Sequence, residues 1–131
     1  VEVIGSRFGA VALDRADLQS VRWANAKIGY LNLRYAAGRD LVFTDCQIEE
    51  CDLAFAGLRR VQLQRCRIGR LTLSSAVLED VDLRGADIER IAGIEGLAGS
   101  IVTEVQLWDL APALAEHLGI TVEPAPPEVG E

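Results

Sequence analysis

Residues 41–90 read LVFTD-CQIEE-CDLAF-AGLRR-VQLQR-CRIGR-LTLSS-AVLED-VDLRG-ADIER when they are divided into units of five. In each of these ten units the first and third residues are apolar, and every charged residue stands at another position. A helix requires apolar residues every three or four positions and a strand every second one, so a strict five-residue period fits neither. The period instead predicts a solenoid, in which successive coils stack on one another.

The same register runs back to Val1 without an insertion. Across residues 1–90 the third position is large and apolar in seventeen of eighteen units, with Gly38 as the exception, and the first position is apolar in all but Ser6. Two inward residues separated by one outward residue predict a short strand, and the remaining two residues predict a tight corner. Four such units would close one square coil of twenty residues.

A twenty-residue period is also visible in the sequence itself, because isoleucine recurs at that interval below Phe8. The series is Ile28, Ile48, Ile68 and Ile88. Residues n and n+20 are therefore predicted to be vertical neighbours, with coils about 4.8 Å apart. We predict an all-β solenoid of about four and a half coils, whose backbone groups pair with the coils above and below.

Four of the five-residue units match a known motif. The units are Ala16–Ser20, Cys51–Phe55, Val81–Gly85 and Ala86–Arg90. They resemble the A-(D/N)-L-x-x motif of the pentapeptide-repeat proteins, and the resemblance extends over about ninety of the 131 residues. It implies a right-handed quadrilateral β-helix. It also implies the family's most discussed activity, in which an acidic β-helix mimics duplex DNA, occupies the DNA-binding saddle of gyrase and lowers sensitivity to quinolones.

The period changes after Arg90, where glycines mark a loosening of the last coil. Thr103 and Gln106 have the spacing of a capping box, and an apolar stripe follows. The stripe consists of Leu107, Leu110, Ala111, Leu114 and Leu118. Because Pro112 lies within it, we predict two short helices, near 104–110 and 112–118, with Gly119 ending the second.

These helices are predicted to cover the open end of the solenoid, with Ile120 and Val122 packing back on it. The segment Leu110–Ile120 reads LAPALAEHLGI and resembles the C-terminal segment of actinobacterial pentapeptide-repeat proteins. The expected organisation is a repeat β-helix over residues 1–100, a helical cap over 101–123 and a flexible acidic tail over 124–131.

The net charge of −7 arises entirely after residue 90. Residues 1–90 hold 13 basic and 13 acidic residues, and no face of the predicted coil is acidic. A surface that imitates DNA needs rows of negative charge, so the neutral shaft disfavours gyrase binding, which remains the alternative function. The net charge of −7 argues against direct binding to nucleic acid or to anionic membranes.

No constellation of residues in the sequence indicates catalysis, a cofactor or a metal. Cys46, Cys51 and Cys66 all occupy inward positions that require a small apolar residue, and His117 has no second ligand at a suitable spacing. We expect a non-enzymatic protein. Three cysteines without a secretory signal favour a reducing compartment, and we expect a bacterial cytoplasmic location.

Two groups of outward apolar residues are candidate contact sites. Tyr35 and Phe55 occupy corners one coil apart, beside Val77 on the adjoining column, so they are either part of a surface for an unknown protein partner or a simple stack between rungs. Val105 and Trp108 lie off the stripe that would face the shaft and are candidate dimer contacts. A homodimer could form through this cap or through the uncapped N-terminal end. We therefore interpret the chain as a rigid protein–protein interaction module.

Overall fold

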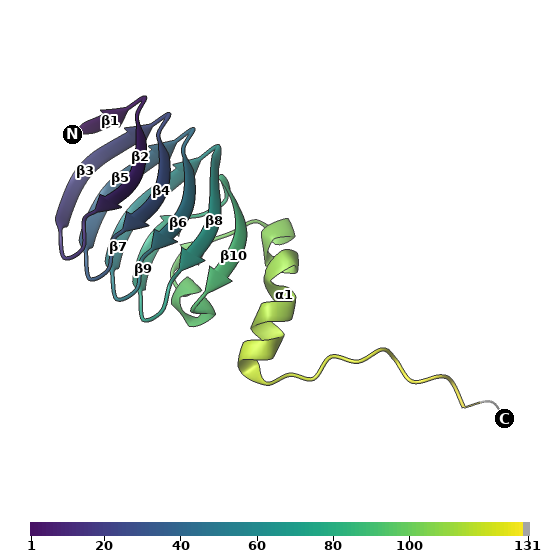
Figure 1. The fold of residues 1–131 in the computed structure, drawn as a ribbon. Coiled ribbons are helices and arrows are strands. Elements are labelled where there is room, and N and C mark those ends of the chain that lie inside the picture. The colour runs from purple at the N-terminus through teal and green to yellow at the C-terminus, as the bar shows by residue number, and fades with distance from the viewer. Residues whose placement is uncertain (130–131) are drawn as a thin grey trace.

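The computed structural model describes residues 1–129, and it is a parallel β-solenoid followed by one helix (Figure 1). Its strands form two sheets. The six-stranded sheet consists, in order, of β1 (Glu2–Ile4), β3 (Asp17–Ala24), β5 (Ala37–Thr44), β7 (Gly57–Gln64), β9 (Val77–Asp82) and β11 (Ser100–Ile101). The five-stranded sheet consists of β2 (Arg7–Ala12), β4 (Lys27–Asn32), β6 (Gln47–Asp52), β8 (Cys66–Thr72) and β10 (Ala86–Ala92).

The predicted register between coils is confirmed. Strand partners through β10 are twenty residues apart, and the isoleucine column appears as Phe8 beside Ile28, Ile28 beside Ile48, Ile48 beside Ile68 and Ile68 beside Ile88. The last rung departs from this rule, since Ser100 of β11 pairs with Val81 at an offset of nineteen. The strict register thus ends where the repeat ends.

The interior of the solenoid is filled by the first and third residues of the units, as their apolar character requires. Ile28, Ile48 and Ile68 are each no more than 3% exposed. At Gly38 the missing side chain leaves no void, because a Cβ there would lie 2.9 Å from Leu58 and 3.0 Å from Leu41. These two leucines occupy the place of the absent third-position residue.

Left-handed backbone conformations turn the chain at three of the four corners of each coil. Within residues 1–129, eleven non-glycine residues have a positive φ, and they recur in columns twenty residues apart. One column contains Arg15, Tyr35, Phe55 and Ser75. Such conformations are unfavourable for residues with a Cβ, so the coil geometry imposes them on whatever side chain the sequence supplies.

The C-terminal region forms one α-helix, α1 (Glu104–Leu118). The short 3-10 helix η1 (Ile94–Leu97) precedes it. The predicted capping box of Thr103 and Gln106 is confirmed, and Gly119 ends the helix with a φ of 75°. The prediction of two helices is wrong, because Pro112 lies inside α1. Proline removes one donor to the carbonyl of Trp108, but both residues are exposed, so water can bond that carbonyl and the helix continues.

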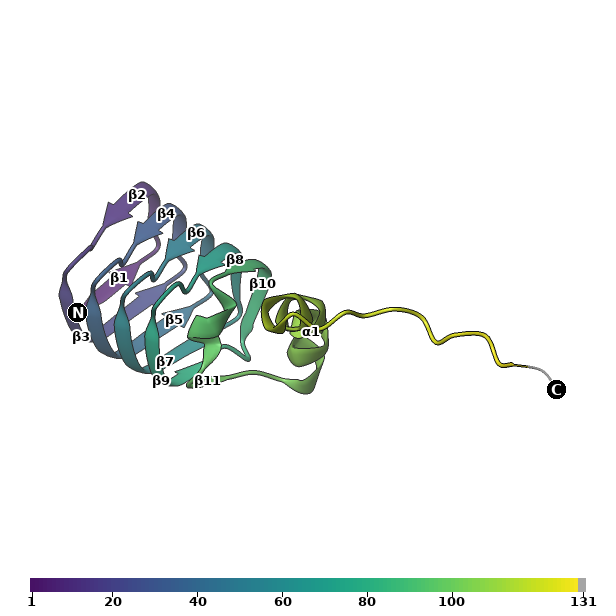
Figure 2. The same cartoon turned by 90° about the horizontal axis from the view of Figure 1, so that it is seen from below.

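Helix α1 lies beside the last coil, and the chain then leads away from the solenoid (Figures 1 and 2). No residue of α1 is fully buried, so the helix covers the end of the shaft less closely than its apolar stripe predicts. The expectation that Ile120 and Val122 pack back is wrong, since both are exposed. The left-handed turn at Gly119 directs the chain outward instead.

Residues 120–129 contain neither helix nor strand, and residues 130–131 of the predicted tail lie outside the described residues. Over residues 1–129, no helix combines the length and the apolar character that crossing a bilayer demands.

Candidate protein-interaction surfaces

Tyr35 and Phe55 each occupy the third residue of a tight turn at the junction of the two sheets. The Ala36 N–H donates to the carbonyl of Leu33 at 3.1 Å, and the Ala56 N–H donates to that of Leu53 at 3.0 Å. Both aromatic residues have a left-handed backbone, with φ of 58° and 61°. These turns fix the direction in which the two side chains leave the coil.

The structure brings the two aromatic side chains into direct contact. Their ring centroids are 4.8 Å apart and their planes differ by 5°, while 47% of Tyr35 and 46% of Phe55 remains exposed. The Arg15 guanidinium lies 4.7 Å from the centre of the Tyr35 ring and adds a cation–π contact from the rung above. The stack is therefore ordered on one side and open to solvent on the other.

Val77 does not join the stack, but it lies on the adjoining column. It begins β9 and pairs with Gly57, which in turn pairs with Ala37. We call the exposed side chains of Tyr35, Phe55 and Val77 the aromatic strip; 71% of Val77 is exposed. The three side chains are therefore exposed, and their role as a partner surface stays a prediction.

A polar cluster around the buried carboxylate of Asp52 lies on the neighbouring coils and was not predicted from the sequence. Asp52 is only 8% exposed. Its carboxylate accepts hydrogen bonds from the Tyr30 hydroxyl at 2.9 Å, from Arg34 at 3.3 Å and from the backbone N–H of Ala54 at 3.0 Å. Burial and the neighbouring Asp52 raise the pKa of Tyr30 above its usual value. Only the period of twenty, which places Tyr30 and Arg34 on the coil next to that of Asp52, could have indicated it.

Acidic and basic residues cancel along the outer surface of the solenoid. Three exposed ion pairs join residues on neighbouring coils, namely Arg60 with Asp40 at 2.6 Å, Arg65 with Asp45 at 2.8 Å and Arg59 with Glu79 at 3.4 Å. The bonds from Arg60 and Arg65 hold the pKa values of Asp40 and Asp45 below their usual range. In each of these three pairs the two residues are twenty positions apart, so the coil period places them together.

The candidate dimer residues lie on α1. Val105 and Trp108 are 72% and 71% exposed, and they are three residues apart, so they occupy one face of the helix. The helix is tied to the last coil by Gln106, whose side-chain N–H groups donate to the carbonyls of Leu83 at 2.8 Å and Ala86 at 2.9 Å. Trp108 therefore stays available for other contacts.

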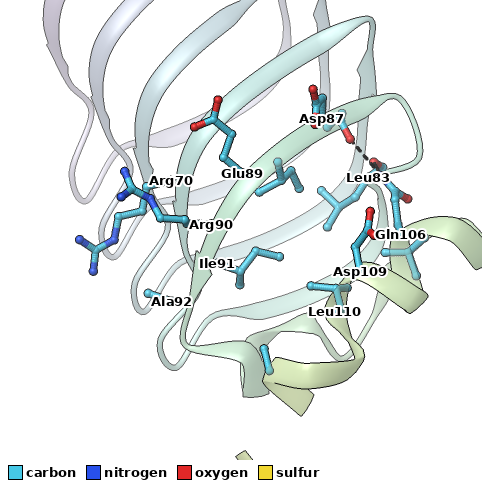
Figure 3. Close-up of a pocket in the computed structure, with 14 residues that line it drawn as sticks. Arg70, Leu83, Asp87, Glu89, Arg90, Ile91, Ala92, Gln106, Asp109 and Leu110 are labelled. Carbon is cyan, nitrogen blue, oxygen red and sulfur yellow. Dashed lines mark hydrogen bonds between the residues drawn. The ribbon is translucent and has the colours of Figure 1, made fainter. Parts of the chain in front are cut away.

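A cleft separates α1 from β10, and it encloses about 490 Å³. Figure 3 shows Ile91 of β10 and Leu110 of α1 at its apolar lining, with Asp109 entering from the helix. Arg70 and Arg90, which are partners on neighbouring strands, lie together at one end. No sequence pattern indicated this cleft, because its shape depends on how closely α1 approaches the coil.

The three cysteines are buried in the core of the solenoid, as their inward positions predict. Burial raises the pKa of the Cys51 thiol to about 12, and the hydrogen bond with Cys46, followed by burial, raises that of Cys66. Among residues 1–129, no three His, Cys, Asp or Glu side chains are placed to hold a metal ion together.

No protein-family model and no curated protein matches this chain. Among solved structures, it is similar to a trypsin-treated form of QnrB1, a plasmid-mediated fluoroquinolone resistance protein. The match covers 95% of this chain and 100% of that one, at 14% sequence identity and a TM-score of 0.33. A likeness of this size carries no inference about function, so the surfaces described above must supply it.

Proposed function

We propose that this chain is a pentapeptide-repeat protein that catalyses no reaction and binds another protein through the aromatic strip. The observation that carries the proposal is the stack of Tyr35 on Phe55, which is half exposed on two left-handed turns. Aromatic residues and arginine are enriched at the centres of protein interfaces. Here they occur together, because the Arg15 guanidinium lies over the Tyr35 ring.

The rigidity of the solenoid supports this role. The backbone of each turn is held within its own coil and to the coils above and below; for example, the Tyr35 N–H donates to the carbonyl of Ala54 at 3.1 Å. A side chain that is already ordered loses little conformational entropy when a partner binds. The strip can therefore contribute affinity even though its exposed area is small.

Gyrase binding is the alternative that the family resemblance implies. The cross-coil ion pairs, such as Arg60 with Asp40, make the shaft a poor imitation of a row of phosphates. The unbalanced acids begin only after Arg90, with Glu95 in η1 and the others on α1 and beyond it. We therefore place the interaction module first, and a supercoiling assay with purified gyrase tests the alternative directly.

A second copy of the chain is a further proposed partner, through the face of α1 that carries Val105 and Trp108. A tryptophan that is 71% exposed favours burial against another apolar surface. Sedimentation of the wild type and of Trp108→Ala tests this dimer. A monomer in both experiments would exclude it, and a dimer that survives Trp108→Ala would direct attention to the N-terminal end.

The strip is tested by affinity capture with wild-type chain, Phe55→Asn and Ser75→Asn. Phe55 and Ser75 occupy equivalent left-handed corners in one column, and asparagine is tolerated in that conformation. In both substitutions asparagine must adopt the same left-handed backbone conformation, but only Phe55→Asn removes an aromatic ring. We expect bound proteins to be lost with Phe55→Asn and retained with Ser75→Asn. An identical set of bound proteins for all three chains would refute the proposal.

A further inference from the structure

A shallow groove of about 360 Å³ runs across β5, β7 and β9 beside the aromatic strip. Ala37 and Gly57 line it, and each follows an aromatic residue of the stack by two positions along the chain. Arg39 and Arg59 also line the groove, and Val77 belongs to it as well. The groove thus has a floor of small residues with guanidinium groups, and Val77 belongs both to it and to the aromatic strip.

The floor is open because Gly57 has no side chain, and its backbone does not require glycine. A Cβ added at Gly57 would meet nothing within 4 Å, and its φ is not in the left-handed region. At Gly69, by contrast, a Cβ would meet the carbonyl oxygen of Glu49 at 2.5 Å. Gly57 is therefore replaceable by a larger residue that would fill the groove and leave the coil intact.

Two of the nearby arginines have no carboxylate partner. Arg39 donates to the side-chain oxygen of Gln19 at 3.1 Å, and Arg15 lies over the Tyr35 ring. Of the carboxylates in residues 1–129, none lies within 4 Å of either guanidinium. Asp17 and Glu79 also line the groove, so an acidic ligand must place its carboxylates toward Arg39 or Arg15.

The chain itself contains a segment of matching chemistry. Residues 119–129 read GITVEPAPPEV, are exposed and lie in neither helix nor strand. The segment contains three prolines, Pro124, Pro126 and Pro127; Pro124 and Pro127 are three positions apart, and Glu123 and Glu128 flank them. No lysine or arginine follows Arg90, so these carboxylates have no such partner nearby in the sequence.

The spacing of the prolines matches the spacing of the coils. A polyproline II helix has three residues per turn and rises about 3.1 Å per residue, so Pro124 and Pro127 would share one face about 9 Å apart. Two coils of the solenoid span about 9.6 Å, at about 4.8 Å for each. A proline-rich segment that runs along the solenoid axis would therefore place these two prolines two coils apart, which is also the separation of the coils of Tyr35 and Val77. Aromatic side chains contact prolines where proteins recognise polyproline II segments.

We propose that the groove beside Tyr35 and Phe55 binds residues 119–129 of a second copy of this chain in the polyproline II conformation. One proline packs on the stack of Tyr35 and Phe55, the other packs beside Val77 and the floor at Gly57, and a glutamate of the segment pairs with Arg39 or Arg15. A second copy is the occupant because the segment leads away from its own solenoid (Figures 1 and 2). The inference rests on the proposed function, since it names a partner for the same strip.

The first experiment titrates a fluorescently labelled peptide of residues 119–129 into the full chain carrying Pro124→Ala and Pro127→Ala, which weakens competition from the chain's own segment. We expect saturable binding that Gly57→Val weakens by about tenfold or more. Gly9→Val is the matched control, because a Cβ at Gly9 also meets nothing within 4 Å and Gly9 lies in β2 of the other sheet. It should change the affinity by less than about twofold. Absence of saturable binding, or equal effects of the two valines, would overturn the proposal.

The second experiment identifies the source of the segment. One full chain carries Gly57→Val and keeps its C-terminal segment, and the other carries Pro124→Ala and Pro127→Ala and keeps its groove. Their mixture should form a heavier species in sedimentation than either chain forms alone. If the mixture forms no heavier species although the labelled peptide binds, the segment does not come from a second copy, and the proposal is overturned.

The two proposals fail in different ways. If Phe55→Asn abolishes capture of another protein but the peptide does not bind, the inference fails and the proposed function stands. If neither capture nor peptide binding depends on Phe55 or Gly57, both fail.

Discussion

The rings of Tyr35 and Phe55 lie parallel at a centroid distance of 4.8 Å, although each residue has a left-handed backbone that bulky side chains rarely adopt. Such a backbone costs about 1–2 kcal/mol for each residue. A stacked aromatic pair contributes about 0.5–1.5 kcal/mol beyond its buried area. The stack therefore offsets only part of the strain, and fold stability alone gives little reason for two aromatic residues at these corners.

The balance predicts that Phe55→Asn changes the free energy of unfolding by less than about 1 kcal/mol, because the lost stack is offset by easier turn formation. Phe55→Val should be more destabilising than Phe55→Asn, since a β-branched residue fits a positive φ poorly. Urea unfolding of the three chains measures both effects. A loss above about 2 kcal/mol for Phe55→Asn would assign the ring a mainly structural role.

The isoleucine column should be far less tolerant than the strip. Ile48 is 3% exposed and contacts Ile28 and Ile68 across the two neighbouring coils. Ile48→Ala is expected to lower the free energy of unfolding by about 2–5 kcal/mol, because the rigid coils cannot collapse around the cavity. Glu49→Ala, at an exposed neighbouring position, should change it by less than about 0.5 kcal/mol. Comparable losses in urea unfolding would contradict the assignment of Ile48 to the core.

The repeat allowed the strip to be predicted because a solenoid converts sequence distance into spatial distance. Once residues n and n+20 are neighbours, Tyr35 must lie beside Phe55 and Arg60 beside Asp40, and the structure has both pairs. The groove next to the strip is less visible in sequence. The sequence alone does not distinguish a glycine that avoids a backbone clash, such as Gly69, from one that leaves open space on the surface, such as Gly57.

The C-terminal region has no repeat, so its packing could not be derived in the same way. The capping box at Thr103 was predictable because it is local. The anchoring of α1 was not, because Gln106 bonds carbonyls twenty and more residues earlier. The continuation of the helix through Pro112 depends on the exposure of its helical neighbours, which the sequence pattern did not specify.

The hydrogen bonds of Gln106 are expected to hold α1 against the solenoid. Gln106→Ala removes the donors to the carbonyls of Leu83 and Ala86 and half of the capping box. The opening free energy of α1 should fall by about 1–2 kcal/mol, while the central coils keep their stability. Hydrogen exchange of residues 104–118 measures this, with exchange in β6 as the internal reference. Faster exchange throughout the solenoid would show instead that α1 is essential to the whole fold.

Pro112 predicts a stabilising substitution. Pro112→Ala supplies the N–H donor that the carbonyl of Trp108 lacks. It also replaces the residue least favourable in a helix by the most favourable one, and their helix propensities differ by up to about 3 kcal/mol. The helix should then show slower hydrogen exchange around residue 112 and stronger helical circular dichroism. Ala113→Gly, in the same helix, should have the opposite effect. An unchanged or weaker helix in Pro112→Ala would mean that its contacts with the last coil require the proline geometry.

The hydrogen bond from Tyr30 to Asp52 predicts a loss of stability at alkaline pH. Burial and the Asp52 carboxylate raise the pKa of Tyr30 in the folded chain above its ordinary value of 10.0. A group whose folded pKa is raised stabilises the fold at pH values below its unfolded pKa, and that contribution is lost as the pH rises through the folded pKa. The free energy of unfolding of the wild type should therefore fall more steeply above about pH 10 than that of Tyr30→Phe, which cannot ionise. Urea unfolding across this pH range measures the two slopes, and equal slopes would exclude Tyr30 as their cause.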